Sequence, residues 1–146
     1  LEETGFTVET APDGTDAVDM VRRADEGWYD AVLMDVQMPV MDGYEATRTI
    51  RALPRQDVKS LPIIAMTANA MEEDKETALK SGMNAHIAKP LDIELFMQIL
   101  GKYLGGGRYE NYTASFRRAV PPLRRRRPAF LFIRQAADAA KKAAAW

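Results

Sequence analysis

Three polar side chains each close a short apolar run of this chain, and their chemistry is complementary: Asp35, Thr67 and Lys89. If each run is a strand of one parallel sheet, the three side chains arrive at the same edge of that sheet. A carboxylate there can act as a nucleophile, while a hydroxyl and an ammonium group can bind the oxygens of a phosphoryl group. The residue types and their order therefore favour phosphoryl chemistry centred on Asp35.

The segments around these side chains have the pattern of alternating strands and helices. Residues 31–34 form an apolar run suited to a strand buried on both faces, and Pro39 ends it. Asp42 with Gly43 has the pattern of a helix N-cap. Such alternation is typical of an α/β fold with a doubly wound parallel sheet. Taken alone, Asp35 could equally be a turn or capping residue, and the other two runs favour the chemical role.

The motifs that carry these residues resemble the receiver domain of two-component response regulators. The matching motifs are Met34-Asp35, Met38-Pro39, Asp42-Gly43, Thr67-Ala68 and Lys89-Pro90. The resemblance covers residues 1–104 and is strongest to receivers that are fused to hybrid sensor histidine kinases. It implies a flavodoxin-like sheet with strand order 2-1-3-4-5.

The resemblance also implies that Asp35 takes a phosphoryl group from a histidine on a partner, either a histidine kinase or a histidine phosphotransfer protein. Thr67 and Lys89 would receive the phosphoryl oxygens and pull the following loops inward. The chain is then a signalling domain rather than an enzyme with a separate substrate, and it catalyses at most its own phosphorylation and dephosphorylation. A receiver-shaped module that binds proteins without being phosphorylated is the alternative.

By the same resemblance, Mg²⁺ neutralises charge on the phosphoryl oxygens, with Asp35 and the backbone carbonyl of Gln37 as its protein ligands. One carboxylate and one carbonyl make a poor Mg²⁺ site, so we expect weak metal binding. His86 holds the position of the aromatic switch that acts with Thr67, although a histidine without a switching role fits the sequence equally well. The peptide bond before Pro90 is expected to be cis.

Receivers begin with a strand that ends in an adjacent acidic pair, and because the sequence starts at Leu1 without one, we expect this receiver to lack that strand. The missing strand would be central in the sheet, so its two neighbours would lack ladder partners. Residues 129–133 offer a substitute strand, followed by the helix-forming residues 136–146. Placing Trp146 ahead of Leu1 would continue that helix, and it would put Arg134-Gln135 where the acidic pair belongs.

This substitution predicts that Phe130, Phe132 and Ile133 are buried beside the Asp35 strand, with the two chain ends close together. The substitute strand could come from the same chain or from a neighbouring copy, as in a swapped homodimer. A linker, a read-through segment or an unrelated extension are the other interpretations of the tail.

The distribution of charge divides the chain between residues 104 and 105. Residues 1–104 contain 10 basic and 19 acidic residues, whereas residues 105–146 contain 10 basic and 2 acidic residues. We therefore expect a receiver over 1–104, a basic linker over 105–128 and a strand–helix tail over 129–146. The arginines 124–127 attract phosphate without reading sequence, but no helix-turn-helix pattern accompanies them, so we do not expect a dedicated nucleic-acid role.

Composition excludes several classes of site. The chain has no cysteine and one histidine, which excludes disulfides, thiolate metal sites and a zinc site built on histidines. No apolar run has the length of a membrane span, and no signal peptide is visible, so we expect a cytoplasmic location. A chain of 146 residues is long enough for one domain with a real core.

Overall fold

The computed structural model describes residues 6–36, 41–67, 72–88, 92–103 and 130–135. The strands are β1 (Phe6–Ala11), β2 (Ala31–Asp35), β3 (Ile63–Thr67), β4 (Ala85–Ala88) and β5 (Phe130–Gln135). The helices are α1 (Gly14–Arg23), α2 (Gly43–Arg51), α3 (Asp57–Ser60), α4 (Glu72–Ser81) and α5 (Ile93–Tyr103). Within these ranges, no helix combines the length and the apolar character that crossing a membrane requires.

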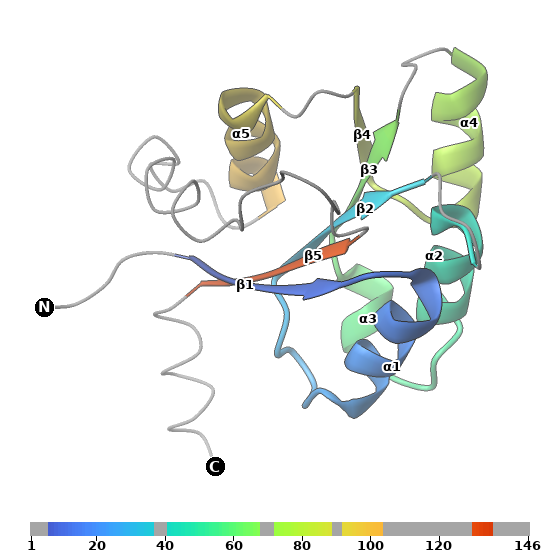
Figure 1. Cartoon of the computed structure of the whole chain (residues 1–146), viewed down its shortest axis with the longest axis vertical. Coiled ribbons are helices and arrows are strands. Elements are labelled where there is room, and N and C mark those ends of the chain that lie inside the picture. Colours follow the sequence, from blue (N-terminus) through green and yellow to red (C-terminus); the bar gives the residue numbers. More distant parts are fainter. Residues whose placement is uncertain (1–5, 37–40, 68–71, 89–91, 104–129, 136–146) are drawn as a thin grey trace, which may run out of the picture.

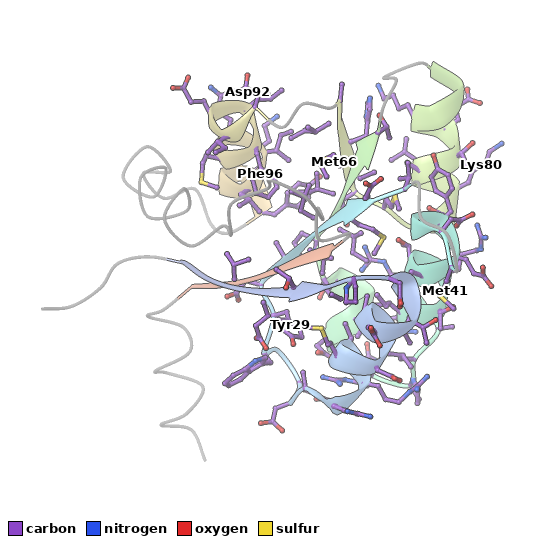
Figure 2. The ribbon with its side chains drawn as sticks, viewed as in Figure 1. Tyr29, Met41, Met66, Lys80, Asp92 and Phe96 are labelled. Atoms are coloured by element: carbon purple, nitrogen blue, oxygen red, sulfur yellow. The ribbon has the colours of Figure 1, made fainter. Side chains whose placement is uncertain are left out.

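Helices cover both faces of one sheet, as the sequence predicted for an α/β fold (Figure 1). Val32 and Met34 of β2 face a core that α1, α2, α3 and α4 complete, whereas Ala31 and Leu33 face a second core beneath α5. Phe96 anchors α5 in the second core and lies on the same side of the sheet as the labelled Met66 (Figure 2). β2 is therefore buried on both faces, which explains why its sequence is a continuous apolar run rather than an alternating one.

The sheet has the order β1-β5-β2-β3-β4, which places the tail strand between β1 and β2. β2, β3 and β4 pair in parallel. β5 is antiparallel to both neighbours: its first residue, Phe130, pairs with Ala11 at the end of β1 and with Met34 near the end of β2. The burial predicted for the side chains of β5, and the helix predicted over 136–146, fall outside what the structure describes and stay predictions.

The prediction that Arg134-Gln135 stands where the acidic pair belongs was wrong, because β5 runs antiparallel to its neighbours. Arg134 pairs with Thr7 near the start of β1, at the edge of the sheet opposite Asp35. Arg134 and Gln135 therefore do not take the place of the acidic pair. An apolar run satisfies the backbone ladder of its neighbours in either direction, so the composition of residues 130–133 carries no information about orientation.

An ion pair fastens three elements together at the edge opposite Asp35. Arg55 Nε and Nη2 donate to the two carboxylate oxygens of Asp57 at 3.0 and 2.9 Å. Arg55 Nη1 donates to the carbonyl oxygens of Val21 and Ala24 at 2.6 and 2.7 Å, which satisfies the last turn of α1. The amide of Gly27 donates to Asp57 Oδ2 at 2.9 Å. This carboxylate thus connects α3 to the turn that enters β2.

The pKa of Asp57 predicts how this connection responds to acid. Burial alone would raise that pKa, but the Gly27 amide and the Arg55 guanidinium lower it below its ordinary value of 3.8. A carboxyl whose pKa is lower in the folded chain stabilises the fold above its unfolded pKa, and this contribution is lost as pH falls through the folded pKa.

Asp57→Asn is therefore expected to lower the free energy of unfolding by about 1–3 kcal/mol at neutral pH, because it weakens charged hydrogen bonds. The difference from the native chain should shrink once pH falls below 3.8. Urea denaturation across this pH range measures both effects, and Asp25→Asn on the exposed surface of the nearby turn is the matched control. A difference that stays constant down to the most acidic condition would contradict the assignment.

Candidate functional site

Asp35 is the last residue of β2, at the edge where the parallel strands end. The four residues before it are fully or almost fully buried, and Asp35 itself is 8% exposed. The backbone pairing continues one residue further, because the amide of Val36 donates to the carbonyl oxygen of Met66 on β3 at 3.2 Å. The carboxylate is therefore carried by a rigid strand that has a neighbour on each side.

Thr67 ends the neighbouring strand β3, one residue beyond the partner of Asp35. Asp35 pairs with Met66 in the parallel register, and Thr67 is 2% exposed. Thr67 pairs in turn with Ala88, which is the last residue of β4 and precedes Lys89. The structure thus brings Asp35 and Thr67 to one edge of the sheet and ends β4 at that edge as well.

Of the remaining predicted site residues, the structure describes only His86. Gln37, Lys89 and Pro90 lie outside the described residues, so their predicted roles stay predictions. His86 lies inside β4, where it pairs with Ala65 of β3 and is half-buried. Its predicted role as a switch also stays a prediction.

The residues at this edge can be tested against what Mg²⁺ needs, which is about six oxygen ligands in octahedral geometry. Across the described part of the chain, no three acidic or histidine side chains gather where they could hold a metal ion. The strand beside β2 reaches this edge with Phe130, which pairs with Met34, rather than with an acidic residue. Among the described residues, Asp35 is the one carboxylate that ends a parallel strand at this edge, so the described part of the site offers Mg²⁺ few ligands.

Two glycines for which the sequence pattern indicated no role in the site touch the segment that follows Asp35. A Cβ atom on Gly43 would lie 2.8 Å from the carbonyl oxygen of Asp35, and one on Gly14 would lie 2.7 Å from the carbonyl oxygen of Met41. Each glycine is the first residue of its helix and follows an aspartate. The repeated Asp-Gly pair was the one feature of the sequence that could have indicated these two close contacts.

This chain matches one known protein family over most of its length. The family model for the response regulator receiver domain matches residues 1–101. A hybrid signal transduction histidine kinase of Dictyostelium discoideum is 36% identical over 117 residues, which cover 79% of this chain and 7% of the kinase. A probable histidine kinase of Oryza sativa subsp. indica is 45% identical over 103 residues, which cover 63% of this chain and 10% of the kinase. The chain thus spans a tenth or less of these curated relatives.

Solved structures give the same result. The receiver domain of a Pseudomonas aeruginosa sensor histidine kinase, crystallised with magnesium coordinated in its active-site cleft, is 44% identical with a TM-score of 0.56. That match covers 65% of this chain and 74% of the other. A second match has a TM-score of 0.55 and 29% identity, over 62% of this chain and 66% of the other. It comes from a Saccharomyces cerevisiae complex between a histidine phosphotransfer protein and the receiver domain of its downstream response regulator. The strand order, the polar edge and these matches show that this chain belongs to the response regulator receiver domain family.

Proposed function

We propose that Asp35 is the phosphoacceptor of a phosphorelay and takes its phosphoryl group from a histidine of a hybrid kinase or of a phosphotransfer protein. The observation that supports this most is the position of Asp35, an acid at the carboxyl end of a strand buried on both faces. In the transfer, a carboxylate oxygen of Asp35 forms a bond to phosphorus while the P–N bond to the donor histidine breaks. The imidazole leaves with the electron pair of that bond and takes up a proton.

Thr67 and Lys89 are proposed to bind the phosphoryl oxygens. Thr67 is buried at the end of β3, beside the strand that carries Asp35, and Lys89 directly follows the β4 residue that pairs with Thr67. A hydroxyl and an ammonium group at such an edge stabilise negative charge that develops on oxygen. His86, half-buried on β4, is proposed to be the switch residue that responds when Thr67 binds the phosphoryl group.

Labelling identifies the acceptor. The chain is incubated with a small phosphoryl donor such as acetyl phosphate, or with beryllium fluoride as a mimic, and the modified residue is mapped by mass spectrometry. Label is expected on Asp35, and Asp35→Asn is expected to reduce it to background. Asp42→Asn is the matched control, since Asp42 is an exposed helix cap seven residues away and asparagine caps equally well. Label on another residue, with Asp35 unmodified, would falsify the assignment.

Repeating the labelling with and without millimolar Mg²⁺ tests the metal. We propose that Mg²⁺ binds this chain weakly, because Asp35 is the one carboxylate among the described residues that ends a parallel strand at this edge. The rate of labelling should therefore increase as the Mg²⁺ concentration increases. It should not saturate at the Mg²⁺ concentrations that fill a site with a complete set of carboxylates. Saturation at micromolar Mg²⁺ would contradict this.

A receiver-shaped binding module that is not phosphorylated is the second candidate. One observation favours it: β5 runs antiparallel and begins with Phe130 at the edge where family members carry their acidic pair. Such a module would bind a histidine phosphotransfer protein with equal affinity whether residue 35 is the native aspartate or asparagine. Absence of label together with equal binding of the native chain and Asp35→Asn would support this candidate over phosphotransfer.

The same strand pairing is compatible with an exchange of β5 between two copies of the chain. Sedimentation of the native chain over a range of concentrations distinguishes a monomer from such a homodimer. The proposed location is the cytoplasm, where phosphoryl donors derived from ATP are available to a phosphorelay.

A further inference from the structure

Two helices of this chain begin with the same pair of residues, aspartate and glycine. The Asp13 carboxylate accepts a hydrogen bond from the amide of Asp16 at 2.9 Å, which caps α1. The Asp42 carboxylate accepts one from the amide of Glu45 at 2.8 Å, which caps α2 and confirms the cap predicted at this position. The aspartates are therefore explained by capping, whereas the glycines that follow them need a separate explanation.

Backbone conformation does not explain these two glycines. Within the described residues, positive φ angles occur only at Gly27 and Gly82, so Gly14 and Gly43 have angles that any residue adopts. Glycine near the start of a helix also costs conformational entropy relative to alanine. What the two positions share is a lack of space, and both residues are buried.

At Gly43, α2 rests directly on the end of β2. A Cβ atom there would lie 2.8 Å from the carbonyl oxygen of Asp35 and 2.9 Å from the Cα atom of Val36. These are backbone atoms, which cannot rotate away as the end of a long side chain can. The amide of Gly43 donates to the carbonyl oxygen of Val36 at 3.3 Å, so the contact is also a backbone hydrogen bond. The first turn of α2 is thus in direct backbone contact with the strand end that carries Asp35.

At Gly14, α1 rests on the residue that precedes the cap of α2. A Cβ atom there would lie 2.7 Å from the carbonyl oxygen of Met41 and 2.9 Å from its Cβ atom. Figure 2 shows Met41 beside the start of α1. The two contacts lie in series along the chain: α1 approaches Met41, Met41 leads into Asp42 and Gly43, and Gly43 approaches the backbone of Asp35.

We propose that Gly14 and Gly43 are positioning residues for the phosphoacceptor, with Gly43 acting directly on the backbone of Asp35 and Gly14 acting through Met41. The inference rests on the proposed function of Asp35. Real Cβ contacts essentially never fall below 3.0 Å and become ordinary at 3.4 Å, so an alanine at position 43, with its Cβ atom 2.8 Å from the carbonyl oxygen of Asp35, must push the helix and the strand end apart. Since a displacement of about 1 Å costs on the order of a hundredfold in rate, Gly43→Ala is expected to slow phosphorylation about tenfold.

The test compares Gly43→Ala and Gly14→Ala with Ile50→Val, a fully buried position near the other end of α2 that leaves the Asp35 contact intact. The rate of Asp35 labelling by acetyl phosphate is measured against donor concentration, below the melting temperature of each variant. Gly43→Ala should lower the maximal rate about tenfold with little change in the half-saturating donor concentration, and Gly14→Ala should lower it several-fold. Ile50→Val should label at the native rate although its melting temperature is reduced.

The possible outcomes are distinguishable. If the native chain itself is not labelled at Asp35, the proposed function fails before the variants are compared. If the native chain is labelled and folded Gly43→Ala labels as fast, the positioning role is wrong. If Gly43→Ala does not fold, Gly14→Ala decides: a several-fold slower rate supports the inference, and a native rate overturns it.

Discussion

Phe132→Pro is expected to destabilise this domain by a large fraction of its total stability. Phe132 lies in the middle of β5, where its backbone pairs with Glu9 of β1 on one side and with Val32 of β2 on the other. In a strand that is flanked on both sides, each interior amide donates to one neighbour or the other. Proline has no amide hydrogen, and its ring is tolerated at sheet edges but not in central strands.

The expected cost is about 3 kcal/mol or more, against a total stability of about 5–15 kcal/mol for a typical domain. For a chain of this length, that corresponds to a melting temperature lower by roughly 10 °C or more. Thermal unfolding followed by circular dichroism measures it. Ser115→Pro, within the predicted basic linker 105–128, is the matched control and should melt like the native chain.

Deletion of residues 105–146 should have a still larger effect, because it leaves β1 and β2 without the strand that joins them. Unpaired ladder groups that stay shielded from water are costly, and newly exposed strand edges promote association between chains. The shortened chain should therefore lose cooperative unfolding or form oligomers. A shortened chain that stays a folded monomer and melts at the native temperature would show that β5 contributes nothing to the fold.

Arg51→Met is expected to lower the free energy of unfolding by about 2–4 kcal/mol, since it removes several hydrogen bonds from a charged donor. Arg51 Nε and Nη2 donate to the carbonyl oxygen of Gly82 at 3.0 and 2.8 Å. Nη1 donates to the carbonyl oxygen of Val58 at 2.6 Å, and Nη2 also donates to Asn84 Oδ1 at 2.8 Å. One guanidinium group thus joins the last turn of α2 to α3 and to the chain between α4 and β4.

Burial lowers the pKa of Arg51, but an arginine stays protonated near neutral pH, so this contribution should not vary between mildly acidic and mildly basic conditions. Urea denaturation measures the effect. Arg48→Met, one turn earlier in α2 at an exposed position, is the matched control and should change stability by no more than about 0.5 kcal/mol. Equal losses in the two variants would mean that Arg51 stabilises only through its place in the helix.

The sequence by itself determined the part of the site that depends on local pattern. Asp35 and Thr67 each close an apolar run, and because parallel strands end at one edge, their order along the chain was enough to place them together. The cap at Asp42 was equally local, since a capping side chain reaches an amide only three residues away. The cap is an interaction between near neighbours in the chain, and the end of each strand is marked by its own apolar run, so a single sequence displays both directly.

Tertiary structure alone decided the rest. β5 pairs antiparallel with both of its neighbours. An apolar run does not predict this direction, because the backbone can form hydrogen-bonded ladders in either direction. Arg51 meets Gly82, and Gly14 meets Met41, across long stretches of sequence that only folding brings together. The glycine positions depend on how closely two backbones approach, and that distance is set by the packing of whole helices on the sheet rather than by any local preference.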